Sequence, residues 1–140
     1  MAAAVLAGVV GSASPAAAAS CNVNPSGVSF GAYDPLSSSP LDGVGNIAIS
    51  CDASTSFAIS LSTGAGSYAE RRMSSGGAAL TYNLYTDASR LTPWGDGSGG
   101  SSTVSMTGAA ADIPVYGRMA AHQNVPAGAY ADTIVVTITY

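Results

Sequence analysis

The residues of this chain that could do chemistry are few and far apart. Its 140 residues include two cysteines, Cys21 and Cys51, and a single histidine, His122. A Ser-His-Asp or Cys-His catalytic set would have to use His122, and a lone histidine in a polar loop is typically a solvated surface group. A metal site needs three or four convergent ligands, which one histidine and dispersed acids do not supply. We therefore predict no catalytic site, no metal and no cofactor.

The N-terminus predicts that the two cysteines reach an oxidising compartment. Residues 1–19 contain a short apolar core and end in the small-residue run Ala17-Ala18-Ala19, which is typical of a secretory signal peptide. No Lys or Arg precedes Arg71, so the positively charged start of a signal peptide is missing, which is compatible with a signal that begins before Met1. The apolar run is too short to span a bilayer. In an exported protein two lone cysteines most simply pair, so we predict a Cys21–Cys51 disulfide.

Composition excludes one class of partner. The chain has no lysine, four arginines and eight acids, and its formal net charge is -4. A nucleic-acid binder needs a basic face that replaces counterions, so we predict no nucleic-acid partner. Charged residues make up only 9% of the chain, which suits a surface that is covered or that packs against copies of itself.

Three further side chains are expected to be structural. Trp94 lies in a glycine-rich loop, and we interpret it as a loop anchor packed on the domain rather than an exposed contact residue. Arg71 and Arg118 lie beside apolar strand residues and are expected to form internal bridges. The acids considered as their partners are Glu70, Asp132 and Asp87.

Residues 20–140 are predicted to form one all-β domain. Apolar residues alternate with a period of two in short runs, and no window of ten or more residues has a helical period. The runs cover residues 28–33, 45–51, 57–61, 80–85, 103–106, 113–119 and 130–140. Residues 45–51 and 57–61 flank a turn-like stretch and predict a hairpin, and residues 64–77 a long connection. Seven or so strands at this spacing favour a sandwich.

The last run is the most informative about assembly. Ile134, Val136, Ile138 and Tyr140 alternate with polar or small residues up to the C-terminus. Soluble proteins protect such an edge with lysine, proline or a bulge, and none of these follows Gly128. The pattern predicts an edge that remains unpaired within the domain and accepts a strand from elsewhere.

A set of short motifs also occurs in a fixed order along residues 21–140. They are Cys21, Phe30-Gly-x-Tyr33-Asp-Pro, Ile49-x-Cys51, Ile59-x-Leu-Ser-x-Gly64, Arg72-Met, Leu80-x-Tyr-x-Leu-Tyr85-x-Asp, Trp94-Gly-Asp-Gly, Val115-Tyr-Gly-Arg118 and Gly128-x-Tyr-x-Asp-Thr-x-x-Val-Thr-x-Thr-Tyr140. This ordered set resembles the spore coat protein U domain family, which includes subunits of archaic chaperone-usher pili.

The resemblance implies an immunoglobulin-like β-sandwich that lacks its final strand. A periplasmic chaperone would lend that strand, an outer-membrane usher would assemble the subunits, and the N-terminal segment of the next subunit would complete the fold. The protein would thus pass through the periplasm to the cell surface. The residues expected to line the groove for the added strand are Val28, Phe30, Ile134, Val136, Ile138 and Tyr140.

Three functions are compatible with this resemblance. The first is a structural subunit of a pilus or surface fibre. Cleavage near Ser20 would leave too short a segment before Cys21 to donate a strand, which favours the fibre tip or a stand-alone coat form. The second is a tip adhesin that binds surfaces through residues 37–41 or 94–99. The third is a spore or cyst coat protein.

Overall fold

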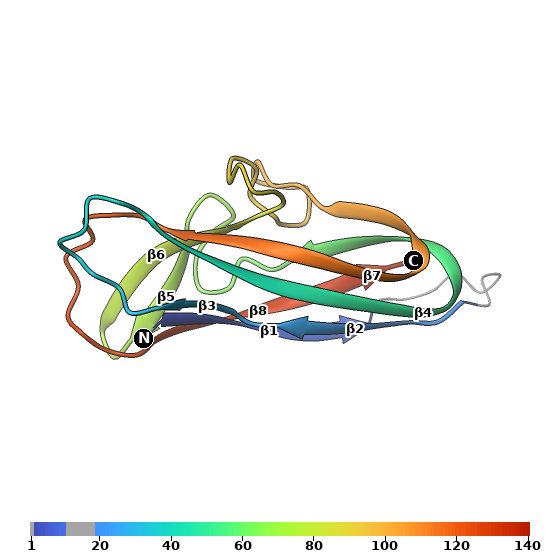
Figure 1. Ribbon diagram of the computed structural model, residues 1–140, viewed down its shortest axis with the longest axis horizontal. Coiled ribbons are helices and arrows are strands. Elements are labelled where there is room, and N and C mark those ends of the chain that lie inside the picture. Colours follow the sequence, from blue (N-terminus) through green and yellow to red (C-terminus); the bar gives the residue numbers. More distant parts are fainter. Residues whose placement is uncertain (1, 11–18) are drawn as a thin grey trace.

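The structure, a computed structural model, describes residues 2–10 and 19–140 as an elongated all-β body (Figure 1). The described residues contain no helix, which confirms the predicted fold class. The strands are β1 (Ala2–Val10), β2 (Cys21–Ser26), β3 (Val28–Gly31), β4 (Leu41–Leu61), β5 (Arg71–Ser75), β6 (Ala78–Tyr85), β7 (Val104–Met119) and β8 (Tyr130–Thr139).

These strands form one hydrogen-bonded sheet that folds back on itself. Its order is β2-β4-β7-β6-β5-β8-β1-β3, and an additional antiparallel pairing of β4 with β8 closes the sheet into a barrel-like sandwich. In Figure 1, β4 and β7 run side by side along most of the body, β1, β2 and β3 run along its lower side, and β8 rises from there toward the C-terminus. The core lies between these layers.

The predicted hairpin of residues 45–51 and 57–61 is wrong. Both runs belong to β4, a single strand of 21 residues, and both pair with β7. The register shifts between Ser50, which lies opposite Ala110, and Thr55, which lies opposite Gly108. The chain does turn back near residues 51–54, as Figure 1 shows, but β7 turns beside it and pairs with β4 on both sides of the irregularity. The two runs therefore pair with β7 and not with each other.

Two other segments also differ from the prediction. Residues 103–106 and 113–119 were expected as separate strands, whereas β7 runs unbroken from Val104 to Met119. The expected connection of residues 64–77 contains β5, which pairs antiparallel with β6. Its sequence, Arg71-Arg-Met-Ser-Ser75, has too few apolar residues to suggest a strand without its partner.

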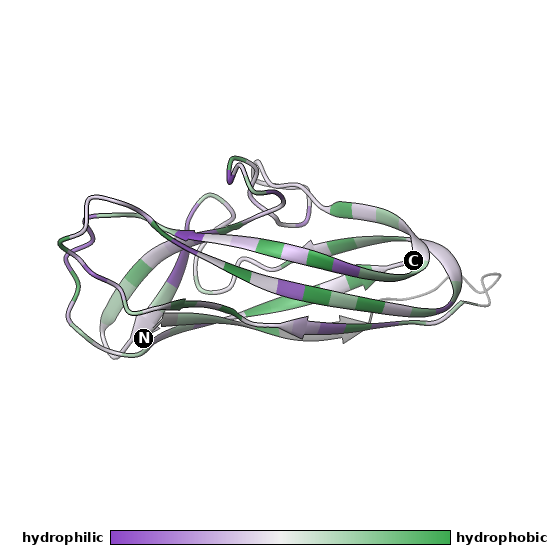
Figure 2. Ribbon diagram, in the orientation of Figure 1, coloured by the Kyte–Doolittle hydropathy of each residue, from purple (hydrophilic) through white to green (hydrophobic). Residues whose placement is uncertain are grey.

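Alternation of apolar and polar residues builds the core. Figure 2 shows apolar and polar positions alternating along β4 and β7. In β8 the alternation is strict, with every second residue from Tyr130 to Ile138 buried. The period of two thus places one face of each strand in the core, as predicted.

The predicted disulfide is present. Cys21 and Cys51 are register partners on β2 and β4, and their sulfur atoms are 2.05 Å apart. The bond ties the start of β2 to the point in β4 where the register with β7 shifts.

Candidate functional site

The predicted groove residues come together on two strands that flank a third. Val28 and Phe30 lie on β3, Ile134, Val136 and Ile138 lie on β8, and all five side chains are buried. We call the space between these two strands the β3–β8 groove. Tyr140 lies past the end of β8, half-buried, and lines a shallow surface depression with Phe57 and Met106.

The edge of β8 that was expected to be unpaired is occupied in this chain by β1. β1 runs parallel to β8 from the Ala2–Tyr130 pair to the Val10–Ile138 pair, over nine register positions. On its other side it runs antiparallel to β3, with Ala4 opposite Val28. The groove is therefore closed by residues 2–10 of the same chain.

This strand lies within the segment that was assigned to a signal peptide. The signal peptide remains a prediction, and residues 1 and 11–18 lie outside the described residues. In β1, Ala4 is fully buried and Leu6 is 6% exposed, which places both side chains in the core.

Three glycines that the sequence analysis did not single out make room for the β3 side of the groove. Gly43 on β4 and Gly117 on β7 are register partners. A Cβ atom on Gly117 would lie 2.5 Å from Cζ of Phe30, and one on Gly45 would lie 2.7 Å from Cγ2 of Val28. Side chains at these positions would push β3 off β4 and β7. Glycine inside a strand is the sequence signal for such a close approach.

A carboxylate fixes the first part of β8. Asp132, the register partner of Ala4, accepts hydrogen bonds from the Tyr82 hydroxyl at 2.6 Å and from the backbone N–H groups of Ala65 at 3.1 Å and Thr133 at 2.9 Å. Burial, together with the bond to Asp132, raises the pKa of Tyr82 far above its usual value. Asp132 thus joins β6, β8 and the loop after β4.

A buried arginine holds the loops beside this carboxylate. Arg71 is fully buried and donates hydrogen bonds to Oδ1 of Asn83 and to the carbonyl oxygens of Ser62 and Trp94. Burial lowers the pKa of its guanidinium. The acid partner that the sequence suggested for Arg71 is replaced by an amide and two backbone carbonyls, so the bridging role holds but the chemistry differs.

Trp94 is the loop anchor that was predicted. Its ring is fully buried, and its indole N–H donates a 3.0 Å hydrogen bond to the carbonyl of Ile59. The loop of residues 94–99 therefore presents no tryptophan to a surface.

The other predicted arginine bridge has a different acid. Arg118 forms a two-pronged pair with Asp42, with its Nε 2.7 Å from Oδ1 and its Nη2 3.0 Å from Oδ2. The hydrogen bond from Arg118 holds the pKa of Asp42 below its usual value. The pair joins β4 to β7 across 76 positions of sequence, which local spacing could not indicate.

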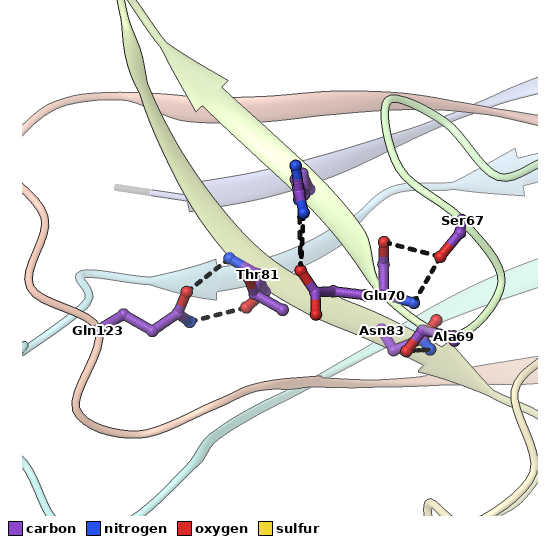
Figure 3. A network of polar contacts seen from close by, with 7 residues as sticks. Ser67, Ala69, Glu70, Thr81, Asn83 and Gln123 are labelled. Carbon is purple, nitrogen blue, oxygen red and sulfur yellow. Dashed lines mark hydrogen bonds and ion pairs between the residues drawn. The ribbon is translucent and has the colours of Figure 1, made fainter.

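Side-chain bonds also attach the outer loops to β5 and β6 (Figure 3). The amide of Gln123 accepts a bond from the Thr81 N–H at 2.6 Å and donates one to the Thr81 carbonyl at 2.8 Å. Ser67 and Glu70 bond to each other within the loop before β5, and Glu70 also pairs with the exposed Arg72. The loop that carries Gln123 is thus attached to β6.

Groups suited to catalysis or metal binding are few among the described residues. His122 is exposed in the loop before β8. Within the described residues no group of three or more His, Cys, Asp or Glu side chains is placed to hold a metal ion. Residues 2–10 and 19–140 also contain no helix of the length and apolarity needed to cross a bilayer.

Comparison with known proteins places this geometry in context. The family described as Spore Coat Protein U domain matches residues 9–137. "Protein U" of Myxococcus xanthus is 37% identical over 127 residues, which cover 81% of this chain and 71% of that protein.

Among solved structures, the chain is similar to one chain of the CsuC–CsuE chaperone-tip adhesion subunit pre-assembly complex from the archaic chaperone-usher Csu pili of Acinetobacter baumannii. The TM-score is 0.61 and the identity 20%. The match covers 87% of this chain but only 40% of the other, so the similarity extends to the fold of a part of that protein.

Proposed function

The chain belongs to the Spore Coat Protein U domain family, and from this premise we propose that it is a structural, non-enzymatic subunit of a surface fibre, assembled by strand complementation at the β3–β8 groove. The observation that carries the proposal is the placement of an extra strand, β1, between β3 and β8. A domain over residues 20–140 would lack that strand. It would leave one edge of β8 and the side chains beneath it without a partner.

Partners follow from the chemistry of this edge. A strand with alternating apolar side chains can bond to the β8 backbone while it buries every second side chain against Ile134, Val136 and Ile138. A periplasmic chaperone would supply such a strand before assembly, and another fibre subunit would supply it afterwards. The similarity in fold to a chain of a chaperone–subunit complex supports this assignment.

The test uses the chain of residues 20–140 with its disulfide oxidised. Alone, it is expected to melt at low temperature or to aggregate, because an apolar edge is exposed. A peptide with alternating apolar residues should raise its Tm with increasing peptide concentration. A cooperative transition at high temperature that the peptide does not change would contradict the proposal.

Two neighbouring valines give a matched pair of variants for this test. Val136 is fully buried in the groove, whereas Val135 points outward and is 37% exposed. Val136→Asp places an unpaired charge under the added strand and should abolish stabilisation by the peptide, and Val135→Asp should leave it intact. If the aspartate variant does not fold, Val136→Thr, which keeps the shape of the side chain, is tested in its place.

A second candidate is a coat protein, in which the domain packs laterally without forming a fibre. The description of the family and the similarity to Protein U of Myxococcus xanthus favour it. Immunoelectron microscopy of the producing cells separates the two functions, because a fibre subunit lies on thin appendages and a coat protein lies in a continuous layer.

A third candidate, surface attachment through loops, has a narrower basis. Leu36 is 88% exposed in the loop after β3, and Leu91 is 81% exposed in the loop after β6. Large apolar side chains that are this exposed to solvent are suited to contact with an apolar surface. Loss of attachment to polystyrene in a Leu36→Ser, Leu91→Ser variant that still assembles would favour an adhesin, and unchanged attachment would exclude these loops.

A further inference from the structure

We infer that residues 2–10 act as an internal strand that closes the β3–β8 groove for as long as they remain attached, and that their removal opens the groove to a partner. This inference rests on the proposed function, because it concerns what controls access to the same groove.

The first support is the depth to which the segment is inserted. β1 pairs with β8 over its whole length and with β3 at its start, so both of its backbone edges are used there. Ala4 and Leu6 are as deeply buried as Val28 and Phe30. A segment that merely lay on the surface would not bury these side chains in the common core.

The second support is that the direction of β1 follows from how it is connected. The chain leaves β1 at Val10 and re-enters the sheet at Cys21, and ten intervening residues are enough to reverse its direction. β1 therefore folds back along β2 and β3 and runs antiparallel to β3. β8 runs opposite to β3, so a strand tethered in this way must be parallel to β8.

The third support is chemical compatibility. Residues 2–10 carry no charge, so the whole segment can enter an apolar groove without burying an ion. A small side chain, Ala4, lies at the level of Asp132, and a larger one, Leu6, lies at the level of Ile134. A competing strand must use the same backbone edge of β8, so it cannot bind until β1 leaves.

The experiment compares the full chain with the chain of residues 20–140, both with the disulfide intact. A labelled peptide of alternating apolar residues should bind the shorter chain and should not bind the full chain at the same concentration. Leu6→Asp in the full chain should restore binding, because a buried charge expels β1. The matched control is Ala3→Asp, since Ala3 is only partly buried, and it should leave the groove closed.

A cross-link tests the direction of the strand. Ala3 and Ala131 are register partners in the parallel arrangement, so a pair of cysteines at these positions should oxidise to a second disulfide. If β1 were reversed about the Leu6–Ile134 pair, Ala3 would instead lie opposite Thr137. The Ala3→Cys, Thr137→Cys variant should therefore remain reduced, and preferential oxidation of that pair would overturn the parallel arrangement.

The two proposals fail in different ways. If the shorter chain binds the peptide and the full chain binds it equally well, the internal strand is refuted and the proposed function stands. If neither chain binds and both melt at the same temperature, the proposed function fails as well. A full chain that closes its groove only in concentration-dependent oligomers would refute an intramolecular strand.

Discussion

At the scale of single residues, the β3 side of the groove depends on glycines, which leave room for the side chains of β3. Gly43 and Gly117 face each other across β4 and β7, and the Phe30 ring occupies the space above them. Phe30 in turn packs edge-on against Tyr82, with ring centroids 6.1 Å apart. The position of β3, and therefore the width of the groove, is set by these contacts.

Gly117→Ala is therefore expected to destabilise the fold. Its methyl group would approach Phe30 and Val28 too closely, and overpacking of this kind costs about 1–3 kcal/mol. Gly77→Ala is the matched control, because nothing lies within 4 Å of the position that its Cβ would take. Urea unfolding measures both variants, and equal stabilities would contradict the proposed packing.

Tyr82 gives a prediction about pH. Its folded-state pKa is raised above the ordinary value of 10.0, so the folded state keeps its proton while the unfolded state loses it. The stability that this group contributes is complete below pH 10 and declines as pH rises above 10. Tyr82→Phe should cost about 1–3 kcal/mol at neutral pH, because Asp132 loses a donor.

The measurement is urea unfolding of both proteins between about pH 8 and about pH 11. The difference in unfolding free energy between wild type and Tyr82→Phe should shrink over that range. A constant difference would show that Tyr82 ionises equally in both states.

Residue types indicated the buried face of β8 but not the contacts between β4, β7 and β3. Strict alternation was enough to predict that Ile134, Val136 and Ile138 are buried. The Asp42–Arg118 pair and the role of Gly117 depend on which strands lie side by side, and alternation carries no information about that. Tyr140 continues the alternation but lies beyond the end of β1, whose last register pair is Val10 with Ile138.

At the scale of elements, the boundaries of β4 and β7 were the main error, for a physical reason. Asp52-Ala-Ser-Thr55 has the composition of a turn, and residues 52–54 are exposed. Local composition predicts that the chain turns here, but it cannot show whether the two flanking runs pair with each other or with a third strand, and here β7 pairs with both. The fold class needed no such long-range information.

Removing the disulfide should weaken the link between β2 and β4. It closes a loop with a sequence separation of 30, and the chain-entropy estimate for such a loop is about 3–4 kcal/mol. The Cys21→Ser, Cys51→Ser variant should lose about that much stability in urea and become insensitive to reductant. Two free thiols in the exported wild type, detected by alkylation and intact mass, would contradict the prediction.

At the scale of the whole molecule, the proposed assembly depends on where the N-terminal segment is cut. A chain cleaved near Ser20 keeps an acceptor groove but retains only one residue before Cys21, too few to form a donor strand. Mixed with a polymerising subunit, it should appear once per fibre, at one end. Immunogold labelling checks this, and label along the whole shaft, or fibres of this protein alone, would contradict it.

The short link between Val10 and Cys21 also has a quantitative consequence for competition. A link of ten residues holds its segment at an effective concentration on the order of 1 mM. A partner strand of equal intrinsic affinity at about 1 μM would therefore face a disadvantage of roughly a thousandfold, or about 4 kcal/mol. Cutting the link removes that advantage at once, because the released segment dilutes into bulk solution. A single proteolytic step would thus act as a concentration switch, without any change in the groove itself.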